Sequence, residues 1–493
     1  MLSKVLAMSC PRGGCTAPGQ RILPRRMQAT VSHTAAIREA SEREEVVREA
    51  PSPRGLPLVG TTLSLWLRGS AAQLHRYVDL RHAQLGPVYR EAIGPVDAYF
   101  VADPLEMRRV FQLEGKHPRN LLPDAWILYN QLYGCKRGLL FMDGEEWLHF
   151  RRIMNSIMLK DADTGMEQPC RQVAADLVAE WSQHAHQQVP RLEQALYQWS
   201  TEVLVANLVG GDKFAEHSSA IRRLPGLRGL SEQVRQVFCE SSKLSLLPAR
   251  VARAIRLPAW ARFERAVDHA VHGASSLVLD LLPFSRGGDG MLERMLAAGV
   301  ELSDTVRIVA DLILAAGDTS AVTMQWVLYL LAKNPDAQER AAQDPQILRG
   351  VVKEAMRLYP VAPFLTRILP DESRLAGYTI PGGSLVLLSL YTSGRSAANF
   401  PDPSRFWPER WSRENSSGGL LGVNHASASI PFGLGARSCI GRKLADIQLT
   451  QLISQLLAGF RIELVEPEKE VDMVLRLVSV PNHPLKLKLV PRK

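Results

Sequence analysis

The sequence predicts a mostly α-helical protein with a minor β component. Apolar residues recur three and four positions apart along most of the chain, which is typical of helices packed on a core. Strand-like runs are short and do not alternate with helices, so a βαβ architecture is not expected. With 493 residues, 46% of them hydrophobic, the chain has enough apolar surface for one large buried core.

The composition excludes several classes of protein. A charged fraction of 22% with abundant apolar residues excludes a disordered chain, and six scattered cysteines exclude a disulfide-stapled miniature. The cysteines also lack paired metal-ligand spacing, so a reducing compartment is expected. The net charge of +9 suits an acidic partner or an anionic membrane. No interleaved basic and aromatic array is present, so we expect no nucleic-acid partner.

The N-terminal segment has the composition of a targeting sequence rather than of a folded domain. Residues 1–38 contain no Asp or Glu but carry six basic residues: Lys4, Arg12, Arg21, Arg25, Arg26 and Arg38. An Arg-rich, acid-poor segment with Ser and Thr is typical of a mitochondrial transit peptide; the alternative is a disordered basic tail. We therefore expect a transit peptide and acidic linker over residues 1–45, followed by a single catalytic domain over residues 46–493.

The body of the chain begins with a proline-rich lead-in at 51–60, which cannot be a helix or a central strand. Helical periodicity then predicts helices over 144–159, 173–184, 192–208, 227–241 and 442–460. Alternating or β-branched runs predict strands over 88–93, 98–101, 378–380, 384–390 and 474–480.

One predicted helix is apolar on nearly every side. Ser303 is the expected N-cap and Asn334-Pro335 the expected end, and Asp311 and Asp318 argue against a membrane span because charges are costly inside a bilayer. We therefore expect a long central buried helix. Gly317 and Asp318 are both unfavourable inside it, which predicts that the helix opens there with Asp318 and Thr319 lining a site. A local irregularity with a capped polar pair is an equal alternative.

A glycine-rich loop near the C-terminus carries the chemistry. Phe432-Gly-Leu-Gly-Ala-Arg437-Ser-Cys439-Ile-Gly441 directly precedes the last predicted helix. The amide groups at a helix N-terminus stabilise a thiolate at Cys439, and such a thiolate can bind a metal. Arg437 can pair with an anion beside that metal. A lone cysteine is more often an inert buried thiol, but the whole pattern favours a metal ligand.

This loop resembles the haem-ligand loop of the cytochrome P-450 superfamily. The resemblance implies the cytochrome P-450 fold, with the long central helix over haem b and Cys439 as the axial ligand of the haem iron. It also implies haem contacts from Trp147, Arg151, Arg367, Phe432 and Arg437. Asp318 and Thr319 correspond to the acid–alcohol pair that relays protons, although Ala316 stands where the family usually has Gly.

Two further motifs resemble the same family and occur in the expected order. Glu354-Ala-Met-Arg357 is similar to the helical Glu-x-x-Arg, and Pro408-Glu-Arg410 to the segment whose arginine completes a buried triad. Glu354 and Arg357 share a helix face, and Arg410 would bind the same carboxylate. The resemblance implies that the triad of Glu354, Arg357 and Arg410 is structural and holds the region behind Cys439.

The resemblance implies a monooxygenase, and the mitochondrial address implies its electron donor. Electrons would come from NADPH through ferredoxin reductase and a mitochondrial ferredoxin. Four basic residues match docking positions of the mitochondrial members: Arg349, Lys353, Arg442 and Lys443. Arg349 and Lys353 lie four apart on one helix and so share a face. The alternative is an ordinary solvated charged face.

Other segments resemble the arthropod ecdysteroid 2-hydroxylases of the Halloween group. They are 123–131, 137–142, 315–319, 358–364, 388–395 and 474–481. This branch also carries the Ala316-Gly317 variant. The implied reaction is 2-hydroxylation of an ecdysteroid, from 2-deoxyecdysone to ecdysone. Apolar segments expected to line a pocket for this small hydrophobic steroid, unless they are plain core, are 126–132, 313–315, 361–365 and 477–480.

A basic amphipathic stretch at 243–262 predicts peripheral association with the inner membrane, on the matrix side; an ordinary surface helix is the alternative. The rival functions are another mitochondrial sterol or steroid hydroxylase, a haem-thiolate isomerase or dehydratase that needs no outside electrons, and a non-enzymatic haem-thiolate sensor. Asp318 and Thr319 argue against the isomerase.

Overall fold

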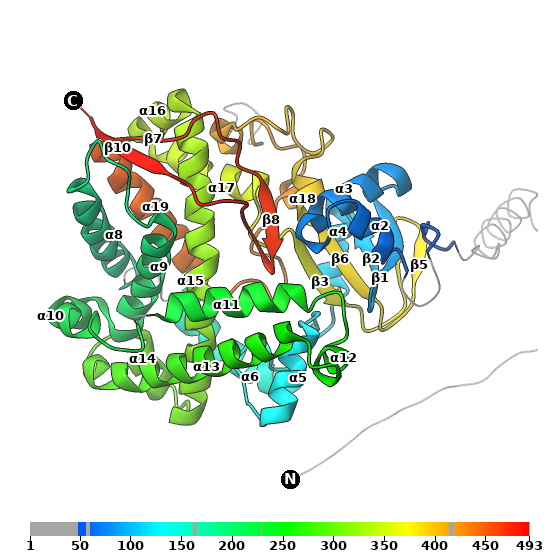
Figure 1. Cartoon of the computed structure of the whole chain (residues 1–493), viewed down its shortest axis with the longest axis horizontal. Coiled ribbons are helices and arrows are strands. Elements are labelled where there is room, and N and C mark those ends of the chain that lie inside the picture. Colours follow the sequence, from blue (N-terminus) through cyan, green and yellow to red (C-terminus); the bar gives the residue numbers. More distant parts are fainter. Residues whose placement is uncertain (1–47, 56–59, 161–164, 228, 414–418, 493) are drawn as a thin grey trace, which may run out of the picture. The chain divides into compact units, whose positions relative to one another are not determined.

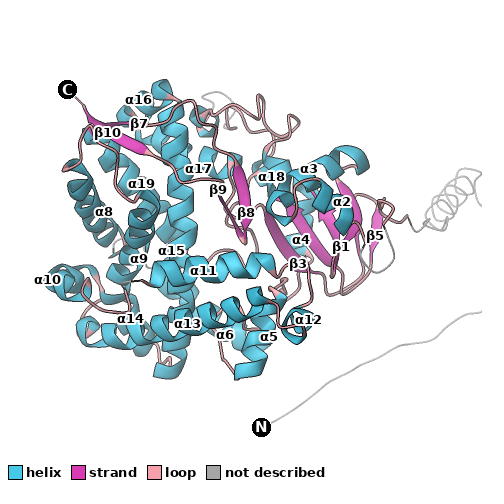
Figure 2. Cartoon of the chain, in the orientation of Figure 1, coloured by secondary structure: helices cyan, strands magenta, loops and turns pink. Residues whose placement is uncertain are grey.

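The computed structural model describes residues 48–55, 60–160, 165–227, 229–413 and 419–492. Helices dominate it, beside a smaller region of strands (Figures 1 and 2). Residues Glu49–Lys493 form one compact unit. The predicted transit peptide lies outside the described residues, and the lead-in is described only in part.

The α-helices are α2 (Thr62–Leu67), α3 (Leu74–Leu85), α4 (Pro104–Gln112), α5 (Asp124–Tyr133), α6 (Gly144–Asn155), α8 (Glu167–Ser182), α9 (Leu192–Val209), α10 (Gly211–Ile221), α11 (Leu230–Lys243), α12 (Ala249–Ala254), α13 (Pro258–Ser285), α14 (Met291–Ala297), α15 (Leu302–Lys333), α16 (Pro335–Gln343), α17 (Pro345–Leu358), α18 (Leu390–Gly394) and α19 (Arg442–Gly459). Shorter turns are η1 (Ala71–Gln73), η2 (Ser156–Lys160), η3 (Pro408–Trp411) and η4 (Ala426–Ala428). The five predicted helices are therefore confirmed as α6, α8, α9, α11 and α19, with shifted ends.

The strands form one four-stranded sheet, ordered β1-β2-β6-β3, and three two-stranded pairs. The sheet contains β1 (Val88–Ile93), β2 (Val96–Val101), β3 (Phe364–Ile368) and β6 (Leu385–Ser389), and the pairs are β4 (Ser373–Leu375) with β5 (Tyr378–Ile380), β7 (Phe460–Leu464) with β10 (Leu487–Pro491), and β8 (Met473–Arg476) with β9 (Val478–Pro481). Within the sheet, β3 runs antiparallel to β6 with Arg367 opposite Val386. This register fixes where the side chain of Arg367 leaves the sheet.

The prediction of one strand over 474–480 is wrong. Leu477 has a φ of 67°, in the left-handed region, and it separates β8 from β9 as the tip of a hairpin. The turn could not be predicted, because neither Gly nor Asn marks it and Leu is unfavourable at positive φ.

The predicted central helix is confirmed as α15, which runs through the middle of the helical region in Figure 1. It begins after Glu301 rather than after Ser303. It also continues without interruption through Gly317, so the predicted opening there is wrong. A Cβ at position 317 would lie 2.6 Å from the ring of Tyr197 on α9, so the glycine is needed for close packing of two helices.

None of the described helices is both long and apolar enough to span a bilayer. In α15, the residues that follow Asp318 are nearly all buried by neighbouring helices. A helix that is apolar on all sides is stable in this position because protein surrounds it.

Candidate active site

Cys439 lies in a tight loop directly before α19. The amide of Cys439 donates a 2.8 Å hydrogen bond to the carbonyl of Phe432, which closes the loop. Gly433 and Gly435 have φ values of 68° and 76°, a conformation that side chains rarely adopt. Gly433 and Gly435 are therefore required by the backbone conformation of the loop that carries Cys439.

Two properties of Cys439 together locate its sulfur. The residue carries exposed surface, yet the surrounding protein removes water from the thiol and raises its pKa. Both hold if the sulfur faces a space enclosed by the protein. The amides of Gly441 and Arg442 and the charge of Arg151 act in the opposite direction and favour the thiolate.

The three arginines predicted to contact the haem lie at this loop: Arg437 belongs to it, and Arg151 and Arg367 contact it. Arg151 donates a 2.6 Å hydrogen bond from Nη2 to the carbonyl of Ser438, but its buried Nε has no partner among the described residues. Burial lowers the pKa of Arg437 to about 10; Asp143 opposes this, and the charges of Arg367 and Arg151 lower it further. Positive charge therefore accumulates beside Cys439.

The partners of these arginines were only partly foreseen. Arg437 places its guanidinium 4.4 Å from the ring centre of Trp147 and donates to Asp143 over 2.7 Å. Trp147 is buried beneath it, as a support for Arg437. Arg367 donates from Nε to Glu114 over 2.5 Å. Sequence reasoning missed Glu114, because an acid after a helix carries no local signal of a partner 253 residues away.

These residues fit a haem. The group needs a thiolate ligand, apolar contact and cations for its two carboxylates. Cys439 can supply the thiolate, and half-buried Phe432 can supply apolar contact. Arg151, whose Nε has no partner among the described residues, can bind a haem carboxylate.

The predicted acid–alcohol pair lies on α15, with its two members on different faces. Thr319 is half-buried and donates a 3.0 Å hydrogen bond to the carbonyl of Ala315. Ala315 is exposed in the middle of a buried helix, so this face of α15 borders open space. Asp318 is 8% exposed, and burial raises its pKa to about 7; Glu193 adds to the rise and Arg235 opposes it.

A cavity of about 760 Å³ reaches Asp318 from the side of α9 and α11. Its lining includes Tyr197, Arg235 and the β9 residues Val478 and Val480, but not Cys439. The cavity therefore gives Asp318 access to solvent along a route separate from the cysteine loop.

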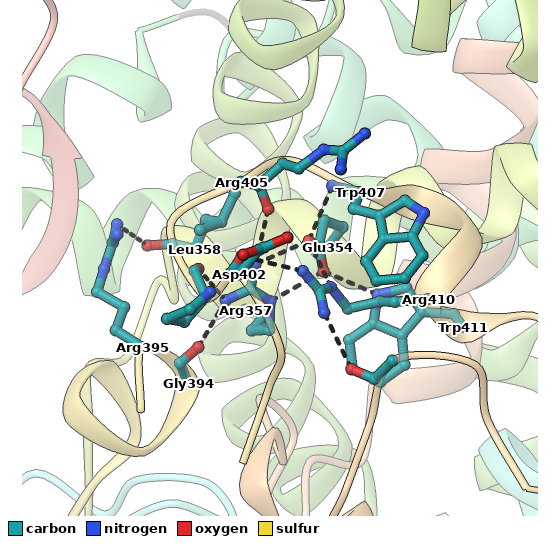
Figure 3. Close-up of polar contacts among 12 residues, drawn as sticks. Glu354, Arg357, Leu358, Gly394, Arg395, Asp402, Arg405, Trp407, Arg410 and Trp411 are labelled. Atoms are coloured by element: carbon teal, nitrogen blue, oxygen red, sulfur yellow. Dashed lines mark hydrogen bonds and ion pairs between the residues drawn. The ribbon is translucent and has the colours of Figure 1, made fainter. Parts of the chain in front are cut away.

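The predicted structural triad is present as one closed cluster (Figure 3). The carboxylate of Glu354 accepts hydrogen bonds from Arg357 over 2.9 and 2.7 Å and from Arg410 over 2.9 Å. Trp407, through its amide, and Trp411, through Nε1, add two further bonds of 3.0 Å. The tryptophans were not foreseen. All three charged side chains are fully buried, which suits a structural role.

The four predicted docking residues lie on α17 and at the start of α19. Arg349, Lys353 and Arg442 are exposed, and Lys443 is half-buried. Lys353 and Arg442 both lower the pKa of Asp446, although burial raises it more, so the two helices contribute to one basic surface. The acid within this surface, Asp446, was not foreseen.

The predicted pocket segments divide into core and lining. Trp126 belongs to the core: its ring packs against Phe141, Phe238 and Phe263, and its Nε1 donates to Ser241 over 2.9 Å. The segments 361–365 and 477–480 are joined, because the amide of Ser479 donates to the carbonyl of Val361.

Comparison with known proteins gives consistent results. The family model for cytochrome P-450 matches residues 50–489. Cytochrome P-450 315a1, mitochondrial, of Drosophila melanogaster is 37% identical, over 100% of this chain and 96% of that protein. Mitochondrial sterol 26-hydroxylase of Rattus norvegicus is 28% identical over 96% of each chain. The mitochondrial cholesterol side-chain cleavage enzyme of Oncorhynchus mykiss is 27% identical over 87% of this chain and 88% of that protein.

The matched region contains the cysteine loop, the closed triad and the helix with the acid–alcohol pair, so sequence and geometry agree over nearly the whole body. The chain therefore belongs to the cytochrome P-450 family of haem-thiolate monooxygenases, among its mitochondrial members.

Proposed function

We propose that the chain is a ferredoxin-dependent mitochondrial monooxygenase that hydroxylates a steroid, and that the reaction is the 2-hydroxylation of an ecdysteroid. The observation that carries the enzymatic part is the glycine-rich loop that presents Cys439 directly before α19, with Arg151 bonded to the carbonyl of Ser438 and its Nε unpartnered among the described residues. The ecdysteroid part is supported by the segments that resemble arthropod ecdysteroid 2-hydroxylases, and by the mitochondrial relative from a fly.

When bound, the haem supplies the activation of dioxygen, and the overall reaction converts a C–H bond, dioxygen, two electrons and two protons into an alcohol and water. The chain itself supplies the protons. A carboxyl with a pKa of about 7 both takes up and releases a proton at neutral pH, so Asp318 can relay protons from the cavity beside α9. The hydroxyl of Thr319 donates to Ala315 and so keeps its lone pairs free to accept a hydrogen bond.

Arg349, Lys353, Arg442 and Lys443 would hold an acidic ferredoxin. Exposed cations on two neighbouring helices near the cysteine loop provide complementary charge, which accelerates encounter and fixes orientation. This placement supports electron delivery on the side of the molecule that carries Cys439.

The α11–α13 connection would contact the matrix face of the inner membrane. It exposes three basic and two large apolar side chains: Arg250, Arg253, Arg256, Val251 and Ile255. The other two basic residues of the stretch 243–262, Lys243 and Arg262, pair with Glu240 instead. Basic and apolar groups together favour binding to anionic lipid. Replacing Arg250, Arg253 and Arg256 by Gln should weaken binding to anionic liposomes; unchanged binding would contradict the membrane contact.

The decisive experiment supplies the purified protein with ferredoxin, ferredoxin reductase, NADPH and 2-deoxyecdysone. We expect a substrate-induced change in the iron spin state and a product one oxygen atom heavier, with the hydroxyl on carbon 2 by NMR. Cholesterol serves as the comparison substrate.

A sterol hydroxylase of another specificity is the second candidate, because sterol 26-hydroxylase is among the relatives. Turnover of cholesterol with none of 2-deoxyecdysone would favour it. Turnover with peroxide alone would favour the isomerase class. Carbon monoxide binding without any substrate-induced spin change would favour a sensor.

A further inference from the structure

Glu114 is a buried acid that joins two distant parts of the haem site. It follows α4 and is 5% exposed. One carboxylate oxygen accepts a 2.5 Å hydrogen bond from Nε of Arg367 on β3. The other accepts a 2.9 Å hydrogen bond from the amide of Ala436, three residues before Cys439. A single side chain therefore links an arginine of the site to the loop that carries the metal ligand.

The loop is shaped to admit this carboxylate. A Cβ at Gly435 would lie 2.1 Å from Oε1 of Glu114, so any side chain there would displace the acid. Gly433, two residues earlier, has a similar positive φ, but its Cβ would meet Leu365 and Ser438 at ordinary contact distances of 3.5 and 4.0 Å. The backbone conformation alone explains the glycine at position 433. At position 435 the carboxylate of Glu114 is a second reason for glycine, because it occupies the space that a side chain would need.

Arg367 is held in place by more than the ion pair. Its Nη1 donates to the carbonyl of Thr366 over 2.8 Å, and its guanidinium lies 4.8 Å from the ring centre of Phe111. Nη2 points toward the carbonyl of Leu434 in the cysteine loop, at 3.4 Å. The acid, the arginine and the loop thus form one hydrogen-bonded unit with little exposure to water.

We propose that Glu114 is a positioning residue of the haem site. It fixes Arg367 and the Cys439 loop relative to each other, and its charge lies in a water-poor region close to the loop. A nearby negative charge stabilises the more positive, oxidised state of a metal centre, so Glu114 lowers the reduction potential. The proposal depends on family membership and holds for any substrate.

The test uses two substitutions in the holoprotein. Glu114→Gln keeps an oxygen for the Ala436 amide but removes the charge, so the thiolate-type Soret band with carbon monoxide should persist while the reduction potential becomes more positive. Glu114→Ala removes both contacts. It should lower the fraction of thiolate-ligated haem and speed haem transfer to apomyoglobin about 10-fold, as for other outer-shell partners of metal ligands.

Matched controls separate positioning from general stability. Glu91 is similarly buried and bonded to Thr61 and Tyr77, but it lies in the sheet region, so Glu91→Gln should leave the potential unchanged. Gly435→Ala should lose haem faster than Gly433→Ala, and adding Glu114→Ala should partly rescue it. Unchanged potential in Glu114→Gln, together with equal haem transfer in the two glycine variants, would overturn the proposal. Both measurements remain available if Glu114→Ala alone does not fold.

Discussion

The molecule contains two buried clusters of arginine and glutamate, and they are built in opposite ways. In the cluster around Glu354, one carboxylate serves two guanidiniums, and every guanidinium nitrogen of Arg357 and Arg410 has an acceptor. In the cluster around the cysteine loop, Arg367 pairs with Glu114 and Arg437 with Asp143, whereas Arg151 donates only to the carbonyl of Ser438 and its Nε has no partner among the described residues.

The difference indicates which cluster awaits a ligand. In the cluster around Glu354 every guanidinium nitrogen already has an acceptor within the protein, so no donor remains for an outside anion. In the cluster around the cysteine loop the buried Nε of Arg151 lacks an acceptor among the described residues, and an anionic group can supply one. The closed cluster therefore suits a structural role, whereas the open cluster retains a donor that fits an anionic group such as a haem carboxylate.

Breaking the closed cluster should have the largest effect. Glu354→Ala leaves Arg357 and Arg410 buried without a counter-charge, which costs about 3–5 kcal/mol of folding free energy. Denaturant unfolding of the purified protein measures the loss. Glu354→Gln is the matched control, since it removes the charge but keeps an acceptor, and we expect an intermediate loss. If Glu354→Ala unfolds at the wild-type midpoint, the cluster is not structural.

A lone buried acid provides the next contrast. The pKa of Asp318 is raised from 3.8 to about 7, so the folded state binds the proton more tightly than the unfolded state. This contribution to folding free energy is fully present below pH 3.8 and is lost as the pH rises toward 7. Asp318→Asn should remove this pH dependence and stabilise the protein at pH 8 by about 2–4 kcal/mol.

Unfolding midpoints measured from pH 5 to pH 8 test this prediction on the wild type and the Asn variant. Asp311→Asn serves as a control, because Asp311 on the same helix is paired with Arg137 over 2.6 Å and should lose stability instead. A stabilised Asp311→Asn would contradict the contrast between the two acids.

Opening the second cluster should weaken cofactor binding rather than folding. Arg151→Met removes a guanidinium that lacks one partner, so the apoprotein should unfold at or above the wild-type midpoint. Haem should nevertheless leave about 10-fold faster, because one cation is lost. Transfer to apomyoglobin and apoprotein unfolding give the two readouts. If the Arg151→Met apoprotein loses as much unfolding free energy as Glu354→Ala, the two clusters do not differ in the way described.

Exposed cations should have the smallest effect. Lys353→Gln should raise the KM for ferredoxin a few-fold at low salt and hardly change kcat, and the difference should fade as ionic strength rises. Arg90→Gln is the control, because Arg90 is equally exposed but pairs with Asp97 on the sheet. An equal rise in KM for both variants would show that only net charge matters.

The sequence predicted the parts of the site that are local in the chain. The cysteine loop and the Glu354–Arg357 pair each lie within ten residues of sequence. Glycine conformation and helical spacing are therefore enough to predict that each forms a local structural unit. Glu114 and Tyr197 escaped prediction, because their partners Ala436 and Gly317 lie more than a hundred positions away. Their contacts arise from packing, for which a single sequence contains no periodic signal.

The same contrast explains the errors in the fold. Helix existence follows from apolar spacing, whereas the start of α15 after Glu301 and the hairpin tip at Leu477 depend on tertiary contacts that override local preference. Gly317 was interpreted as a break in the helix, and the reason for it is instead the aromatic ring on α9.

The Cys439 loop takes its partners from much earlier in the chain, 287 residues away at Arg151 and 322 residues away at the acid that holds the Ala436 amide. During synthesis or translocation, Glu114 and Arg151 therefore emerge long before Cys439, the residue that would bind the iron. Pigment capture must be a late event in maturation, after α19 has emerged and docked. A chain truncated before Phe432 would retain most of its helices yet stay colourless, because it would lack Cys439.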